Sequence, residues 1–264
     1  MPYLELNDLN IYYELKGLGA PLVLVPGLSG TCDTFSLVSN AFAKDFTVVS
    51  LDNRGSGRSF SQTKHFTIQN MAEDLASLVN LLEFDKINLL GHSMGGFIVQ
   101  EYVNKYPDKV DKIILSNTSR KCSYRNKDIF QCLIKLIKNA DYLECWHRMF
   151  SQWIYTDEFI NNNPRSYESA ISYSLHYPYA QCADYFEAQA LACANYKTTV
   201  KDKNQIPSLI LYGDKDKLIT PEESLELLNY FPNSKKALMK RSGHIPMIEN
   251  KEEYSEIIID FLNP

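Results

Sequence analysis

The sequence lacks several features that would place it in a specialised class of protein. No apolar run among its 264 residues approaches the roughly 18 to 20 residues that a membrane-spanning helix needs. The segment Met1–Leu6 has neither the basic nor the apolar part of a secretory signal, so we expect a cytoplasmic protein. A formal net charge of −5 argues against nucleic acid as the main partner, because phosphate contact needs a basic surface.

The cysteines lack any spacing typical of a metal site. The six stand at positions 32, 122, 132, 145, 182 and 193, with no C-x-x-C pair and no cysteine–histidine run of zinc-ligand spacing. We therefore expect free thiols that serve as small buried apolar groups. We also expect neither a metal nor an organic cofactor.

What the sequence does contain is a succession of short apolar runs, each followed by a turn and an amphipathic stretch. These runs are rich in leucine and β-branched residues and do not alternate with polar residues, which is typical of parallel strands covered on both faces. They are Leu22–Val25, Val48–Leu51, Ile87–Leu90, Ile113–Leu115, Leu209–Tyr212 and Ala237–Met239. The pattern predicts an α/β domain with a mostly parallel central sheet flanked by helices.

Helices are expected between these runs, and an antiparallel pair before them. One helix should follow Thr67 as its N-cap, a second should span Gly95 to about Lys105, and a third should run from Pro221 through Leu228. Tyr3–Leu6 and Ile11–Leu15 should pair in antiparallel fashion at the sheet edge.

The alternation of strand and helix breaks between about Ser119 and Asn204. This stretch holds both tryptophans and five of the six cysteines, and Ile129–Ile137, Tyr142–Trp153 and Tyr179–Ala194 are typical of amphipathic helices. Ligands of open α/β sheets bind at the carboxyl ends of the strands. We therefore expect residues 119–204 to cap the site and residues 1–118 with 205–264 to form the core domain. The alternative is a helical subdomain that only adds stability.

The strongest chemical motif is Gly91-His92-Ser93-Met94-Gly95, which stands between a buried strand and a predicted helix. A sharp strand-to-helix turn would expose the Ser93 hydroxyl at the carboxyl edge of the sheet, and only small residues at the two glycine positions allow the close backbone approach. The helix would direct its first N–H groups toward a developing oxyanion. The motif therefore predicts Ser93 as a nucleophile.

A serine nucleophile needs a base, and five histidines are available. His92 should point elsewhere from its place on the turn, and structural or surface roles are expected for His65, His147 and His176. His244 directly follows the last predicted strand, which places it at the same sheet edge as the nucleophile. We predict that His244 is the base.

The base in turn needs an orienting carboxylate, for which the strand ending at Tyr212 supplies two candidates. Asp214 immediately follows a glycine and could serve the turn itself. Asp216 lies further along the loop and can reach a histidine, so we favour Asp216. The order Ser93, Asp216, His244 is the one expected of this type of triad.

Two backbone N–H groups should complete the site as an oxyanion hole. One should belong to Met94, which directly follows the nucleophile, and the other to Leu28 in the loop after the strand Leu22–Val25. The alternative for that loop is an ordinary strand-to-helix connection.

Together these motifs resemble the α/β-hydrolase fold superfamily, and within it small bacterial carboxylesterases and 3-oxoadipate enol-lactonases. Residues 51–59, Leu-Asp-Asn-Arg-Gly-Ser-Gly-Arg-Ser, resemble the family's D-x-R-G-x-G-x-S turn, which we interpret as structural. Gly213–Asp216 matches the G-x-x-D acid motif and Gly243-His244 the G-H base motif. Pro26 departs from the family, in which many members have a histidine before the glycine of the oxyanion loop.

The resemblance implies acyl transfer through a covalent acyl-enzyme, with a small or medium carboxylic ester as substrate and an enol-lactone as an alternative. A nucleophilic serine weighs against the dehalogenases and epoxide hydrolases of the superfamily, which use an aspartate. A non-enzymatic alternative is a ligand-sensing protein that keeps the triad.

A local excess of positive charge suggests one further alternative. Between residues 120 and 148 there are seven basic and three acidic residues, a local charge of +4. The basic residues are Arg120, Lys121, Arg125, Lys127, Lys135, Lys138 and Arg148. Such charges are usually a solvated helix face, but they could dock an acidic acyl carrier protein, as expected of a pimeloyl-carrier methyl-ester hydrolase.

Overall fold

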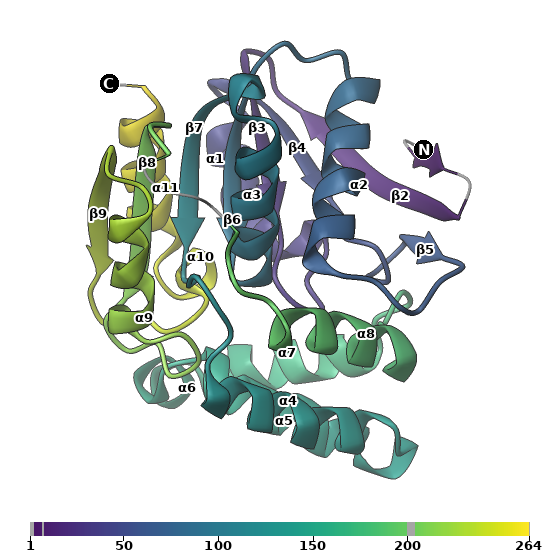
Figure 1. Ribbon diagram of the computed structural model, residues 1–264. Coiled ribbons are helices and arrows are strands. Elements are labelled where there is room, and N and C mark those ends of the chain that lie inside the picture. The colour runs from purple at the N-terminus through teal and green to yellow at the C-terminus, as the bar shows by residue number, and fades with distance from the viewer. Residues whose placement is uncertain (1–2, 7, 200–203, 264) are drawn as a thin grey trace.

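The central element of the protein is a twisted sheet, seen from one face in the computed structural model of Figure 1, which describes residues 3–6, 8–199 and 204–263. In these ranges the strand order is β1-β2-β4-β3-β6-β7-β8-β9, and β5 pairs with β2. The strands are β1 (Tyr3–Leu6), β2 (Leu9–Lys16), β3 (Ala20–Val25), β4 (Phe46–Leu51), β5 (Phe60–Ser61), β6 (Ile87–His92), β7 (Val110–Ser116), β8 (Ser208–Gly213) and β9 (Ser234–Met239).

All pairs among β3, β4 and β6 to β9 are parallel, whereas β1, β2 and β5 pair in antiparallel fashion. The expected mostly parallel sheet and the antiparallel edge pair are therefore confirmed. Each predicted apolar run lies within a strand, and the strands extend one to three residues beyond the runs.

The central strands β3, β4, β6, β7 and β8 are buried along most of their length because successive side chains enter two different cores, whereas the edge strand β9 is mostly exposed, contrary to the expectation for its apolar run. In β3, Val23 and Val25 pack in one core, while Leu22 and Leu24 pack in the other. The first core is covered by α2 (Ile68–Leu81) and α3 (Met94–Lys105), and the second by α1 (Ser36–Phe42) and α11 (Lys251–Leu262) (Figure 1). Side chains alternate across a strand, so a sheet with two covered faces needs apolar residues at every position.

Of the three helices predicted between the strands, two begin or end where the sequence predicted, and the third is shorter than predicted. The Thr67 hydroxyl accepts a hydrogen bond from the Asn70 N–H, 3.2 Å, and α2 begins at the next residue. α3 ends at Lys105, before Pro107, as expected. The helix that begins at Pro221 is shorter than predicted: α9 ends at Leu225, and residues 226–229 continue as a 3₁₀ turn.

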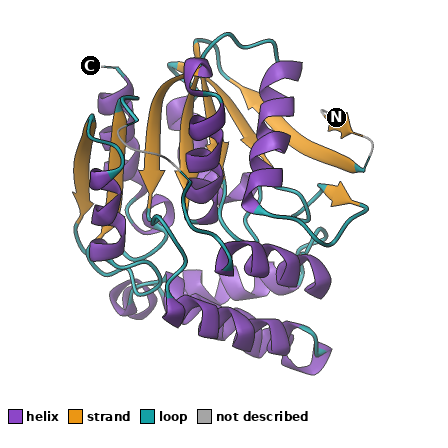
Figure 2. Cartoon of the chain, viewed as in Figure 1, coloured by secondary structure: helices purple, strands orange, loops and turns teal. Residues whose placement is uncertain are grey.

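Five helices stand between β7 and β8 in the chain, and we refer to them as the helical segment. They are α4 (Tyr124–Ile137), α5 (Leu143–Ile154), α6 (Asp157–Asn162), α7 (Pro164–Leu175) and α8 (Ala183–Ala194). Figure 2 shows that they lie beyond the carboxyl ends of the parallel strands. The predicted helices correspond to α4, α5 and α8, while α6 and α7 were not predicted. Residues 200–203 of the predicted segment lie outside the described residues.

The loop after β4 is joined to α2 by a buried ion pair. The Arg54 guanidinium donates to both carboxylate oxygens of Asp74 in α2, at 2.6 Å each, and both side chains are buried. This arrangement agrees with a structural interpretation of residues 51–59.

All six cysteines are free thiols, but only half are buried. The expectation of buried apolar thiols is confirmed for Cys32, Cys122 and Cys193 and wrong for Cys132, Cys145 and Cys182, which are exposed on or beside the helical segment. Cys132 and Cys145 occupy exposed positions of α4 and α5, and Cys182 directly precedes α8, so none of the three contributes to the core. No helix in the described ranges is long and apolar enough to span a bilayer.

Candidate active site

The turn from β6 to α3 holds Ser93 in an uncommon backbone conformation, with φ of 54° and ψ of −118°. The flanking backbone approaches so closely that a side chain on Gly95 would overlap the carbonyl oxygen of Val25. The Ser93 N–H donates to the Ser116 carbonyl, 3.0 Å, and the Thr118 hydroxyl donates to the Ser93 carbonyl, 2.7 Å. The main chain of the serine is therefore held on both sides, and the strained conformation directs its side chain toward the loops beyond the sheet.

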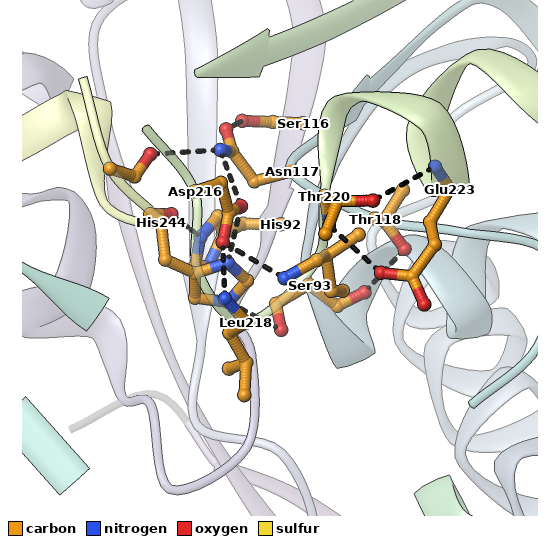
Figure 3. Close-up of polar contacts among 12 residues, drawn as sticks. His92, Ser93, Ser116, Asn117, Thr118, Asp216, Leu218, Thr220, Glu223 and His244 are labelled. Atoms are coloured by element: carbon orange, nitrogen blue, oxygen red, sulfur yellow. Dashed lines mark hydrogen bonds and ion pairs between the residues drawn. The ribbon is translucent and has the colours of Figure 1, made fainter. Parts of the chain in front are cut away.

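Two further side chains form a relay of hydrogen bonds with the serine (Figure 3). His244, in the loop after β9, places Nε2 2.9 Å from the Ser93 Oγ and Nδ1 2.8 Å from Asp216 Oδ2. Both residues are at least nine-tenths buried, with 3% and 5% exposure for His244 and Asp216. Three residues that are far apart in the sequence thus meet at the carboxyl edge of the sheet, where the sequence predicted them.

The carboxylate of Asp216 is fixed by donors other than the histidine. Its Oδ1 accepts the N–H groups of Leu218 and Ile219, 2.9 Å each, and its Oδ2 accepts the side-chain amide of Asn117, 3.0 Å. These contacts orient the carboxylate toward the imidazole of His244. The same Asn117 amide also donates to the Gly243 carbonyl, 3.0 Å, so it joins the acid loop to the base loop.

Asp214, the other acid that the sequence offered, binds the loop after β9 rather than its own turn. Its Oδ1 accepts the Ser242 N–H at 3.3 Å, and no hydrogen bond joins it to His244 among the described residues. The structure therefore brings Asp216 rather than Asp214 to the base.

The remaining four histidines lie away from the serine hydroxyl. His92 is buried, and its Nε2 donates to the His244 carbonyl, 2.7 Å. Burial, together with the nearby His244, lowers the pKa of His92 to about 3, so its ring stays neutral. His147 lies in α5 with its pKa lowered by burial, whereas His65 and His176 are exposed.

The two predicted oxyanion donors lie on either side of the serine. Met94 is the first residue of α3, and Leu28 lies in the loop after β3. This loop packs directly on Ser93, because a Cβ on Gly27 would lie 3.0 Å from the Ser93 Cβ. Neither the Leu28 nor the Met94 N–H donates to another group in the part of the chain that the structure describes, so both are free to bind a ligand.

A cavity of about 430 Å³ opens beside Ser93 and His244. The core contributes the oxyanion loop and Phe97, and the helical segment contributes most of the remaining wall, including Phe130, Trp146 and Phe150. No lysine or arginine is among the described residues that line it, and its single carboxylate, Asp33, lies at the exposed rim. The cavity is therefore apolar, with a few polar groups near the serine, as in small-molecule sites.

Sequence reasoning missed several polar residues that support these loops. Asn117 directly follows β7. Its position at the end of a predicted strand is a signal that could have indicated it. Glu249 accepts the N–H groups of Gly243, 2.5 Å, and of Thr156, 2.6 Å, and burial raises its pKa. The glutamines of α8 and the turn before it are described below. No group of three or more potential metal ligands occurs within residues 3–6, 8–199 and 204–263.

Comparisons with known proteins cover nearly the whole chain. The family model for the alpha/beta hydrolase fold matches residues 20–251. A putative esterase/lipase of Haemophilus influenzae is 28% identical over 92% of this chain and 83% of its own length. A proline iminopeptidase of Heyndrickxia coagulans is 26% identical over 95% of this chain and 93% of its own.

Solved structures share the same architecture. An esterase of Thermogutta terrifontis superposes with a TM-score of 0.87 at 24% identity, covering 99% of this chain and 98% of its own. The enol-lactonase of Burkholderia xenovorans superposes with a TM-score of 0.89 at 20% identity, covering all of both chains.

Proposed function

The chain belongs to the α/β-hydrolase fold family, and from this premise we propose that it is a serine hydrolase of uncharged carboxylic esters. The family and the relatives support a hydrolase of ester-type substrates. The observation that carries the mechanism is the relay from Ser93 Oγ through His244 to Asp216, with distances of 2.9 and 2.8 Å, at the wall of an apolar cavity.

In the proposed mechanism, Ser93 Oγ attacks the ester carbonyl carbon while His244 Nε2 takes the hydroxyl proton. Asp216 keeps the proton of His244 on Nδ1 and stabilises the imidazolium that forms. The negative charge moves to the carbonyl oxygen, where the N–H groups of Leu28 and Met94 bind it.

Collapse of the tetrahedral intermediate breaks the bond to the alcohol, which leaves with the proton from His244. Water then attacks the acyl-enzyme, His244 takes a proton from that water, and a second collapse releases the carboxylic acid and restores the Ser93 hydroxyl. In this scheme the helical segment is a cap that supplies most of the wall around the acyl group and limits the access of bulk water.

The charge of the cavity favours an uncharged substrate. A lactone or ester that carries a carboxylate would need a positive partner, because an unpaired buried charge is costly. The cavity has no lysine or arginine among its described lining residues, and Asp33 at the rim would repel an anion. For this reason we place simple esters ahead of the enol-lactone of a dicarboxylic acid.

The surface charges do not favour a carrier-bound substrate over a free ester. Four of the seven basic residues between 120 and 148 have acidic partners within the chain, which leaves three without an ion pair among the described residues. The pairs are Arg120–Glu226, Arg125–Glu223, Lys138–Glu187, and Arg148 with Glu144 and Glu168. Charge reversal at Lys121, Lys127 and Lys135 should therefore leave ester turnover unchanged.

The test is a panel of p-nitrophenyl esters of increasing acyl length, with a matched anilide and an ester bearing a terminal carboxylate. Wild type should turn over the uncharged esters continuously, and Ser93→Ala should remove that activity while the thermal midpoint is retained. Turnover that persists in Ser93→Ala would refute the mechanism. A single turnover followed by arrest would instead support a ligand-sensing protein.

A further inference from the structure

The loop that carries the predicted second oxyanion donor is a β-turn. The Gly30 N–H donates to the Gly27 carbonyl, 3.0 Å, which closes the turn over Leu28 and Ser29. In a trans peptide the C=O and the following N–H point in opposite directions. The hydrogen bond on the Gly27 carbonyl therefore determines the direction of the Leu28 N–H, which is the group that must face the oxyanion.

This turn places a serine where glycine is normally found. Ser29 has φ of 62° at the third position of the turn, a conformation that costs energy for any residue with a side chain. Such strain persists only where surrounding contacts hold it. The loop therefore needs ties from outside to remain in this shape.

Two glutamines provide those ties: Gln181 lies in the turn before α8, and Gln189 lies within α8. Gln189 Oε1 accepts the Ser29 N–H at 3.1 Å, and Gln181 Oε1 accepts the Ser29 hydroxyl at 2.5 Å. Backbone and side chain of this one residue are thus both bound by the helical segment. Gln189 is fully buried, so the loss of its hydrogen bonds could not be compensated by water.

The other ends of the same two amides bind the turn that follows β4. Gln189 Nε2 donates to the Arg54 carbonyl, 2.9 Å, and to the Ser56 hydroxyl, 2.8 Å. Gln181 Nε2 donates to the Gly55 carbonyl at 2.7 Å. Since Arg54 is itself fixed by the buried pair with Asp74, each amide ties Ser29 to a rigid part of the core.

We propose that Gln181 and Gln189 are positioning residues that hold Ser29 in its left-handed conformation and so direct the Leu28 N–H toward the carbonyl that Ser93 attacks. This inference rests on the proposed function. It also explains why the helical segment would matter for the rate of the chemical step as well as for the shape of the cavity. An amide is suited to this role because it accepts from Ser29 and donates to the turn with a single planar group.

The decisive variant is Gln189→Met, which keeps the length of the side chain and removes both hydrogen-bonding groups. Misdirecting one oxyanion donor should lower kcat on p-nitrophenyl butyrate about 10- to 100-fold. KM should change less than about threefold, because the donor acts mainly on the transition state. Gln131→Met, at an exposed position of α4, is the matched control and should resemble wild type.

A second substitution separates positioning from general damage. Glycine adopts positive φ without cost, so Ser29→Gly in the Gln189→Met background should recover kcat at least about threefold. Amide exchange in the peptide 26–34, measured by mass spectrometry, should be faster in Gln189→Met and unchanged in Gln131→Met. If Gln189→Met does not fold, Gln181→Met, at a less buried position, carries the same test.

The proposal is overturned if Gln189→Met keeps wild-type kcat, or if kcat falls with no recovery by Ser29→Gly and no change in exchange at 26–34. Failure of the proposed function has a different signature, namely hydrolysis that survives Ser93→Ala. In that case the exchange experiment still reports whether the glutamines hold the loop.

Discussion

The buried histidine beside the nucleophile should make the fold sensitive to acid. His92 is buried and donates through Nε2 to the His244 carbonyl, so its ring is neutral in the folded protein. Its pKa is lowered to about 3 by burial and by His244, against the ordinary value of 6.5 for an unfolded chain. The unfolded state therefore binds the proton first, and stability is lost as pH falls below about 6.5.

The size of the effect follows from the two pKa values. At pH 5 the histidine of the unfolded chain is almost fully protonated while His92 in the fold is not, which costs about 2 kcal/mol of unfolding free energy relative to pH 7.5. Gln at this position cannot titrate but still offers an N–H to the His244 carbonyl. The loss of stability between pH 7.5 and pH 5 should thus be about 2 kcal/mol smaller in His92→Gln than in wild type.

Urea unfolding at the two pH values measures this difference, with Trp146 and Trp153 as intrinsic fluorescence probes. His65→Gln, at an exposed position in a loop, controls for the removal of one histidine and should follow wild type. Equal losses of stability in wild type and His92→Gln would refute the reasoning.

Three further predictions concern the acid, the core ion pair and the cavity. Asp216→Asn should lower kcat for p-nitrophenyl butyrate about 10⁴-fold, whereas Asp214→Asn should lower it far less, and equal losses would contradict the assignment of the acid. Asp74→Asn should destabilise the fold by about 3 to 5 kcal/mol in urea unfolding, because it removes the carboxylate that binds the buried Arg54 through both oxygens and leaves only Asp8, 3.8 Å away. Its neighbour Glu73 is paired with exposed Lys105, so Glu73→Gln should change the unfolding midpoint much less. Phe150→Ala should raise kcat/KM for long acyl esters relative to butyrate by about 10-fold or more, and an unchanged ratio would mean that the acyl chain lies elsewhere.

The elements that position the site could be predicted because each has a local cause. Five buried strands and the edge strand β9 contain short apolar runs, and a parallel sheet brings their carboxyl ends to one edge. Ser93, Asp216 and His244 each follow such a run, so their encounter was expected from topology before any distance was known. Their catalytic roles, and those of Leu28 and Met94, stay predictions.

The supporting contacts could not be predicted, because they depend on pairs of residues far apart in the chain. Gln189 contacts Ser29 across 160 positions, and nothing in the spacing of either residue indicates it. The helices α6 and α7 were missed for another reason. α6 has only six residues, and both helices contain many polar residues and bury only Tyr167 and Ile171, so their apolar periodicity is weak.

The helical segment is fixed both to the loop that carries Ser29 and to the loop that carries His244, which limits how it can move. On one side its two glutamines bind Ser29 of the oxyanion loop. On the other side the His244 N–H donates to the Ile154 carbonyl, 2.9 Å, and Glu249 binds the N–H of Thr156 together with that of Gly243. A rigid outward rotation of the whole segment would break contacts to the base loop, to the oxyanion loop, or to both. Substrate should therefore enter at the exposed rim near Asp33 and not through opening of the entire segment, and the catalytic loops should keep their geometry while it enters.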